Sequence, residues 1–278
     1  MTARFSRLSS RFPRKRVFIT GASSGLGLAL TRALAAEGWT LGLFDRNLER
    51  LTAIEAELSE AGVTLIAYPG DVTQSDELTV AVNSFAATHD GLDVMINNAG
   101  VAGAGSMMEV SLEDWRWIID INVMGVVHGS RAAIPHLQRN RTGLLINVAS
   151  AAAFASAPGM ISYNATKAAV VSISETLVNE LRAMDIQVSV VMPTFFQSSL
   201  LETLRGPDSA KAVAQEAMQK SGYSVQEVAS DVLMQAAEGR TYIVLPKSAR
   251  MLWRMKRWMP VRFLAQVAKF RQRSRAAS

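Results

Sequence analysis

The sequence predicts an α/β protein: one domain built on a doubly wound parallel β-sheet with helices on both faces. Runs rich in valine, isoleucine and leucine alternate with segments of helical periodicity along most of the 278 residues. This alternation is typical of parallel strands whose connecting helices cover both faces of the sheet. Neither an internal repeat nor a linker rich in proline and serine divides the body of the chain, so one domain accounts for its length.

The expected strands are the apolar runs at residues 16–20, 40–44, 64–68, 93–96, 144–148, 186–192 and 241–245. Helical periodicity is clearest at residues 26–37, 47–61, 112–137 and 163–184. Residues 142–166 carry no charge, but Pro158 and Gly159 interrupt them, and their composition is poor for a membrane span. We expect a buried strand followed by a loop there.

Charge is distributed unevenly along the chain. Residues 1–16 contain six bases and no acid, and residues 247–278 contain ten bases and no acid. The stretch between them has 13 bases against 24 acids, so the pI of 9.7 describes the two ends. The body therefore lacks the basic footprint of a nucleic-acid-binding domain. We divide the chain into a basic N-terminal arm (1–15), a central domain (16–246) and a basic helical tail (247–278).

Cysteine and histidine usage narrows the chemistry. The absence of cysteine excludes disulfides and thiolate catalysis. His89, His128 and His136 lie far apart without metal-ligand spacing, so no metal site is expected. No apolar core follows the N-terminal arginines as it would in a secretory signal, and a cytoplasmic location is expected.

The first expected strand leads into a glycine-rich loop that fits two motifs. Gly21, Ser23 and Gly25 match the turn that exposes a hydrolase serine, whereas Gly21, Gly25 and Gly27 match a cradle for dinucleotide phosphates. The hydrolase motif needs a histidine late in the chain, but the last histidine is His136. The cradle is favoured, because the helix at 26–37 offers its N-terminal amides and dipole to a pyrophosphate.

Small or polar residues also follow the other expected strands, where ligands of doubly wound sheets bind. Turns favour such residues without any ligand, so the pattern alone does not decide the function. The residues are Asp45 and Arg46, Gly70, Asp71 and Val72, Asn97, Asn98, Ala99 and Gly100, Ala149 and Ser150, and Pro193 and Thr194.

Two further features suggest catalysis but also have structural explanations. Tyr163 and Lys167 are four residues apart and share one face of a helix. A free phenol has a pKa of about 10, and a neighbouring cation lowers that value toward the range of a useful base. Asn122 falls inside an apolar stripe, where a polar side chain needs a partner. A hydrogen-bond partner within the fold and a role in catalysis each explain a polar residue at this position.

Together these residues resemble the single-domain short-chain dehydrogenase/reductases, from Val17 to about Pro246. The resemblance is carried by the Thr20 to Gly27 segment, Asp71, Asn97 to Gly100, Asn122, Ser150 thirteen residues before Tyr163, and Lys167. It implies a Rossmann-like, dinucleotide-binding catalytic domain that transfers a hydride between a nicotinamide cofactor and a secondary alcohol or ketone. A non-catalytic dinucleotide-binding interaction module is the alternative, and a lyase or epimerase on this scaffold is less favoured.

The resemblance also implies roles for single residues. Tyr163 would exchange a proton with the substrate oxygen, Ser150 would hydrogen-bond that oxygen, and Lys167 would lower the pKa of Tyr163 and hold the nicotinamide ribose. Asn122 would keep a water in a proton relay. The implied cofactor contacts are Gly21, Ser23, Ser24, Gly25, Leu26, Gly27, Asp45, Arg46, Asp71, Val72, Asn98, Ala99, Gly100, Tyr163, Lys167, Pro193 and Ser198.

This chain departs from the family pattern after the sixth expected strand. Thr194 follows Pro193 where the family usually has glycine, and Ser198 stands where a threonine commonly touches the carboxamide. The nicotinamide could therefore be placed slightly differently.

Asp45, eighteen residues after Gly27, predicts NAD(H), since an acid there bonds both ribose hydroxyls and repels a 2′-phosphate. Arg46 conflicts with this prediction, because a base at this position favours the 2′-phosphate of NADP(H). We favour NAD(H) over NADP(H).

Substrate and assembly follow from apolar surfaces. Residues 194–224 are expected to cover the site, and their side chains predict an apolar alcohol or ketone as substrate: Phe195, Phe196, Leu200, Leu201, Leu204, Met218 and Tyr223. The helices at 112–137 and 163–184 carry apolar residues over more than one face, and exposed apolar faces find partners. A homodimer or homotetramer is expected.

The tail has a basic amphipathic pattern in two parts. Its apolar residues are Met251, Leu252, Met255, Trp258 and Met259, then Phe263, Leu264, Val267 and Phe270 after Pro260, which can begin a second helix. Arg250, Arg254, Lys256 and Arg257 surround the first part. Three hypotheses stay open: the tail docks on the protein or a neighbouring subunit, lies at an anionic membrane surface, or is disordered. The second would place the protein peripherally at a membrane.

Overall fold

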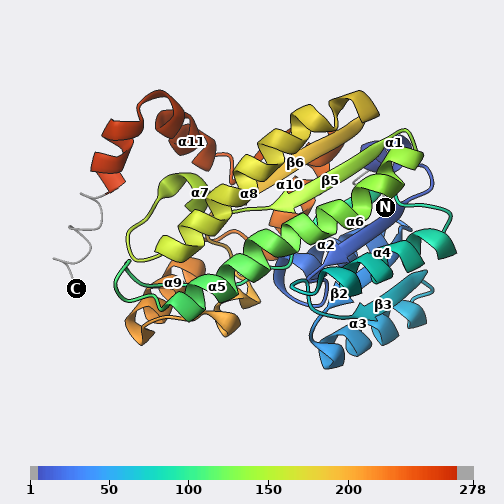
Figure 1. The fold of residues 1–278 in the computed structure, drawn as a ribbon, viewed down its shortest axis with the longest axis horizontal. Helices are drawn as coiled ribbons and strands as arrows, with labels where there is room; N and C mark the ends of the chain where they lie inside the picture. The colour runs from blue at the N-terminus through green and yellow to red at the C-terminus, as the bar shows by residue number, and fades with distance from the viewer. Residues whose placement is uncertain (1–5, 268–278) are drawn as a thin grey trace.

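A seven-stranded parallel sheet forms the centre of the protein, in a computed structural model that describes residues 6–267 (Figure 1). The strand order is β3-β2-β1-β4-β5-β6-β7, so the α/β class and the doubly wound sheet predicted from the sequence are confirmed. The strands are β1 (Arg16–Thr20), β2 (Thr40–Asp45), β3 (Leu65–Pro69), β4 (Val94–Asn97), β5 (Gly143–Val148), β6 (Ile186–Pro193) and β7 (Tyr242–Leu245).

One face of the sheet is covered by α2 (Gly25–Ala35), α3 (Leu48–Glu60) and α10 (Val225–Ala237). These helices place leucine, isoleucine and valine side chains on the apolar strand residues, as the periodicity at 26–37 and 47–61 predicts for α2 and α3. The segment expected as a basic arm includes α1 (Ser6–Arg11), which packs beside α10. Leu8 and Phe12 are buried there, so these two apolar residues hold the helix on the body.

The other face is covered by α4 (Ser75–Thr88), α6 (Gly125–Arg139) and α8 (Ile161–Glu180), as Figure 1 shows. The long helix expected at 112–137 consists of α5 (Leu112–Ile119), a π-helical turn at Asp120–Met124, and α6. Such turns interrupt a helix without ending it and are frequent at functional sites. Asn122 lies in this turn and is fully buried.

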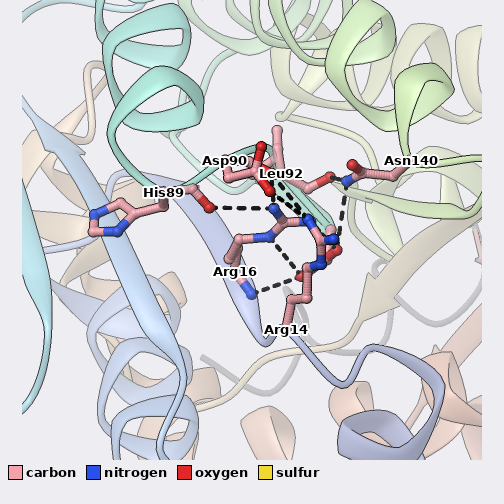
Figure 2. Close-up of polar contacts among 7 residues, drawn as sticks. Arg14, Arg16, His89, Asp90, Leu92 and Asn140 are labelled. Atoms are coloured by element: carbon pink, nitrogen blue, oxygen red, sulfur yellow. Dashed lines mark hydrogen bonds and ion pairs between the residues drawn. The ribbon is translucent and has the colours of Figure 1, made fainter.

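A buried ion pair fastens β1 to the chain just before β4, at the amino ends of the strands (Figure 2). The Arg16 guanidinium donates to Asp93 Oδ1 at 2.8 Å and to Asp93 Oδ2 at 3.1 Å, and also to the carbonyls of His89 and Asp90. Both side chains are almost fully buried, and the additional hydrogen bonds offset part of the cost of removing the charges from water. This cluster lies at the end of the sheet opposite the ligand-binding edge.

The carboxyl ends of the strands form the edge where a ligand of this fold binds. The chain order reverses between β1 and β4, which are neighbours in the sheet, and this leaves a crevice. Around this edge lie α7 (Ala152–Ala155), α9 (Asp208–Gln219) and α11 (Ala249–Trp258). No helix within residues 6–267 is long and apolar enough to cross a membrane.

Candidate active site

A cavity of about 770 Å³ lies at this edge and contains nearly all of the predicted site residues. Its lining includes every residue predicted to be catalytic or to touch the cofactor, except Gly27 and Asn122. The residues come from segments far apart in the chain, brought together because parallel strands all end at one edge. The cavity therefore joins the predicted dinucleotide cradle to the predicted catalytic residues.

The glycine-rich loop has a backbone that only glycine fits well. Gly21 has φ +63°, in the left-handed region that favours glycine. A Cβ at Gly27 would lie 1.9 Å from the carbonyl oxygen of Gly21, so any side chain would push the loop away from the first turn of α2. Asn98 fixes the loop from the neighbouring strand end by donating to the carbonyls of Thr20 and Gly21, each at 3.0 Å.

The loop end that leads into α2 has the features of an anion site. Ser23 Oγ is buried and has no hydrogen-bond partner among the residues that the structure describes. A buried hydroxyl without a partner is costly, and a phosphate oxygen at this point would satisfy it. The helix N-terminus adds free backbone amides and a positive dipole end. The cradle therefore fits the pyrophosphate of a dinucleotide.

Asp45 is held in a defined position at the end of β2. Its Oδ2 accepts from the amide of Ser23 and its Oδ1 from the amide of Asn47, both at 3.0 Å. Arg46 follows and is exposed. Because the Asp45 carboxylate borders the cavity and is tied to the glycine-rich loop, it can meet hydroxyl groups beside the phosphates.

Tyr163, Lys167 and Ser150 meet at one wall of the cavity. Tyr163 and Lys167 are both buried on α8, with Lys167 Nζ 5.7 Å from the centre of the Tyr163 ring. Lys167 Nζ donates to the carbonyl of Val148 at 3.0 Å, so its position is fixed by β5. Ser150 follows β5, and its Oγ accepts from the amide of Ala152 at 3.1 Å. The geometry thus brings a phenol, an ammonium and a hydroxyl to one wall.

Burial shifts the pKa of both titratable groups in this set. Burial lowers the pKa of Lys167 from 10.5 to about 8, because the charged amine has lost water. Burial also raises the pKa of Tyr163, and a hydrogen bond with Ser150 lowers it in part, so the lowered pKa expected from the neighbouring Lys167 is not found in the free protein. The phenol is therefore protonated at neutral pH in the free protein and can donate a proton to an oxygen placed beside it.

Asn122 uses its side chain to clamp the loop after β4. Its Oδ1 accepts from the Val101 amide at 2.8 Å, and its Nδ2 donates to the Val101 carbonyl at 2.9 Å and to Thr166 Oγ1 at 3.2 Å. The side chain therefore links the π-helical turn, the loop at Val101 and α8. Asn122 does not line the cavity. Its water-holding role stays a prediction.

The apolar half of the cavity combines expected and unexpected residues. Of the side chains expected from residues 194–224, those that line it are Phe195, Phe196, Leu200, Leu201, Leu204 and Met218. Tyr223 does not, and its hydroxyl donates to Asp231 at 2.7 Å. The wall formed by Phe154, Ala155, Ala157 and Met160 was not predicted from the sequence. It lies in the uncharged stretch 142–166, where low charge was the only signal.

The tail contributes a further wall. Of its expected apolar residues, Leu252, Met255, Phe263 and Val267 line the cavity, together with Gln266. The helical spacing of these side chains was visible in the sequence, but the surface they cover was not. Phe270, part of the same expected stripe, lies outside the described residues.

The sequence matches a known family over most of its length. Residues 15–209 match the family model described as short chain dehydrogenase. Among curated proteins, the 3-oxoacyl-(acyl-carrier-protein) reductase of Thermotoga maritima is 30% identical over 234 residues, which span 84% of this chain and 94% of that protein.

Two solved structures of short-chain dehydrogenases are similar to this chain over most of its length. A short chain dehydrogenase/reductase from Burkholderia phymatum in complex with NAD has a TM-score of 0.83 and 29% identity, covering 87% of this chain and 92% of its own. A short-chain dehydrogenase from Sphingobium yanoikuyae in complex with NADPH has a TM-score of 0.73 and 29% identity, covering 85% of this chain and 90% of its own.

Proposed function

The chain belongs to the short chain dehydrogenase family, and we propose that it transfers a hydride between a nicotinamide cofactor and a secondary alcohol or ketone. The observation that carries the proposal is the meeting of Ser150, Tyr163 and Lys167 at the wall of the cavity that contains the glycine-rich cradle. A module that only bound a dinucleotide would have no need of this set. When bound, the nicotinamide supplies the hydride chemistry.

The residues of the chain have separate tasks in this proposal. Tyr163 holds the proton that moves to or from the substrate oxygen, and Ser150 donates a hydrogen bond to the same oxygen as charge develops there. Lys167 keeps a positive charge near the phenol and orients the cofactor's ribose. Asn122 fixes the loop at Val101 and thereby the floor of the site.

Turnover of a ketone panel tests the proposal. The reduced cofactor's near-ultraviolet absorbance is followed with each ketone, and the reverse reaction is followed with the matching alcohols. We expect consumption of reduced cofactor with at least one apolar ketone, in line with the cavity lining, and little with sugars. Cofactor binding without turnover of any member would favour the non-catalytic alternative.

We propose NAD(H) as the preferred cofactor because the Asp45 carboxylate is fixed where the adenosine ribose is expected. Replacing Asp45 by asparagine removes the charge that repels a 2′-phosphate and leaves Arg46 in place. The ratio of kcat/KM for NAD(H) to that for NADP(H) should fall at least about tenfold, which corresponds to a change of about 1.4 kcal/mol. A wild-type preference for NADP(H) would contradict the assignment.

The outward face of the tail supports contact with an anionic membrane surface. Met251, Trp258 and Val261 are 72%, 85% and 79% exposed, beside the exposed bases Arg254 and Arg262. Interfacial helices combine such apolar side chains with basic ones.

Sedimentation with phosphatidylserine vesicles tests this contact. The full chain should pellet at low salt and be released at high salt, and neutral vesicles should bind it less. A variant with Trp258→Ser and Val261→Ser should pellet markedly less. If the full chain stays in the supernatant at low salt, the membrane hypothesis is wrong.

Assembly into a homodimer or homotetramer also stays a prediction. Exposed apolar side chains on α5 and the following turn support it, among them Leu112, Ile119 and Met124. A cytoplasmic location likewise stays a prediction.

A further inference from the structure

The C-terminal extension, residues 247–267, is docked on the body of the protein through one face. Phe263 is only 3% exposed and lies in an apolar cluster with Phe154 of α7. The Trp253 ring packs on Tyr242 of β7 with 5.0 Å between ring centres. Aromatic contacts of this kind add to the stabilisation from burial alone. Figure 1 shows α11 and the segment after it at the same end of the molecule as α7.

The docked face also borders the cavity that holds the catalytic residues. Four apolar side chains and one amide reach the cavity: Leu252, Met255, Phe263, Gln266 and Val267. Residues three or four apart lie on one side of a helix, so each of the two helical segments presents a single edge to the cavity. Phe154, which shares a cluster with Phe263, is four residues after Ser150. The extension therefore forms one wall of the apolar half of the cavity.

The part of the cavity wall that the extension contributes, within residues 247–267, contains no charged side chain. Apart from Lys167, the charged residues that line the cavity within the described part of the chain gather around the cofactor cradle: Asp45, Arg46, Arg50, Asp71 and Glu202. The bases of the extension do not line the cavity. A charged or heavily hydroxylated group against this wall would lose water and find the Gln266 amide as the one polar side chain that residues 247–267 place there. A hydrocarbon group would gain about fourfold in affinity for each methylene removed from water.

We propose that the extension is the surface that receives the hydrocarbon end of the substrate, and that the substrates are ketones or secondary alcohols with an extended hydrocarbon group. This inference rests on the proposed function for the reacting end of the molecule. The extension supplies chain-length selectivity, whereas Ser150, Tyr163 and Lys167 supply the chemistry.

Two methionines of α11 give a matched pair of variants. Met255 lines the cavity and Met251 is 72% exposed to solvent. In the full chain, kcat/KM is measured for a series of methyl ketones of increasing alkyl length with Met255→Asp, Met251→Asp and the wild type. Thermal unfolding checks that each variant is folded, and Met255→Ala, a milder change, replaces Met255→Asp if that variant does not fold.

We expect Met255→Asp to change how kcat/KM depends on the alkyl length of the ketone, and to change little else. In the wild type kcat/KM should rise about fourfold per methylene until the wall is covered. Met255→Asp should lower kcat/KM at least about tenfold for the longest ketone and less than about twofold for the shortest, from the same methylene gains. Met251→Asp should change neither by more than about twofold. Equal losses for short and long ketones with Met255→Asp, or an unchanged length dependence, would overturn the inference.

Calorimetric binding separates this inference from the proposed function. The longest and shortest ketones are titrated into cofactor-loaded wild type and Met255→Asp. If no ketone is turned over but the long ketone binds more tightly only to the wild type, the proposed function fails and the inference about the wall stands. If turnover occurs but neither binding nor kcat/KM depends on chain length, the inference fails and the proposed function stands.

Discussion

Replacement of Tyr163 by phenylalanine should lower kcat by about three orders of magnitude, within the range that a positioned acid–base group contributes. The substitution removes only the hydroxyl, and the buried ring keeps its place in the apolar cluster on one face of the sheet. Since the phenol acts on the substrate oxygen, the Kd of the cofactor should change by no more than about threefold. Stopped-flow turnover and fluorescence titration with reduced cofactor measure the two quantities.

Tyr223 provides the matched control for this experiment. It is a tyrosine outside the cavity whose hydroxyl donates to Asp231. Tyr223→Phe should leave kcat within about twofold, because this half-buried side chain packs against the core and does not line the cavity. Near wild-type turnover by Tyr163→Phe with a ketone that the wild type reduces would show that the phenol is not the acid–base group.

The pH dependence of Tyr163 follows from its burial, which raises its pKa. Ketone reduction needs the protonated phenol, so kcat/KM for reduction should be flat through neutral pH and fall only at alkaline pH. Alcohol oxidation needs the phenolate, so kcat/KM for oxidation should rise over the same alkaline range.

Replacement of Lys167 by methionine should damage both turnover and cofactor binding. We expect kcat to fall by about two orders of magnitude and the Kd of the cofactor to rise about tenfold, since one charged hydrogen-bonding group contributes about 1.5–3 kcal/mol. The loss of cofactor affinity distinguishes this variant from Tyr163→Phe. A variant with unchanged cofactor affinity would contradict the assignment of Lys167 to the ribose.

The lowered pKa of Lys167 also predicts how stability depends on pH. Its pKa is about 8 in the folded protein and 10.5 ordinarily, so the unfolded chain binds this proton more tightly between these values. The free energy of unfolding should therefore rise with pH from about 8 to 10.5, by up to roughly 3 kcal/mol from this group. Lys167→Met should lack that rise, which urea unfolding of both proteins at a series of pH values measures.

The sheet and most of its helices were predictable because burial leaves a regular mark on a sequence. The runs at 144–148 and 186–192 are mainly apolar, interrupted only by Asn147, Gln187 and Ser189, because both faces of a parallel sheet are covered. The π-helical turn at Asp120–Met124 was not predictable, because one extra residue in a turn barely changes helical periodicity. Its effect is to bury Asn122, which the sequence marked only as a polar residue in an apolar stripe.

The site residues at strand ends were predictable, because parallel strands bring their carboxyl ends together whatever lies between them in sequence. The wall from α11 and residues 260–267 was not. An apolar stripe indicates that one face of a helix is covered by another apolar surface, and that surface can be lipid or protein. Only the neighbours of Phe263 and Met255 in the folded chain show which face meets the cavity.

Isotope transfer from the cofactor tests whether a hydride passes directly between the nicotinamide and the substrate carbon. A ketone that the protein reduces is supplied with reduced nicotinamide cofactor carrying deuterium on the transferred face of the ring carbon, and the alcohol is analysed by mass spectrometry and NMR. Direct hydride transfer should place one deuterium on the carbinol carbon per cofactor oxidised, and Tyr163→Phe should form almost no product. Alcohol without deuterium, or oxidised cofactor without alcohol, would contradict direct hydride transfer at this site.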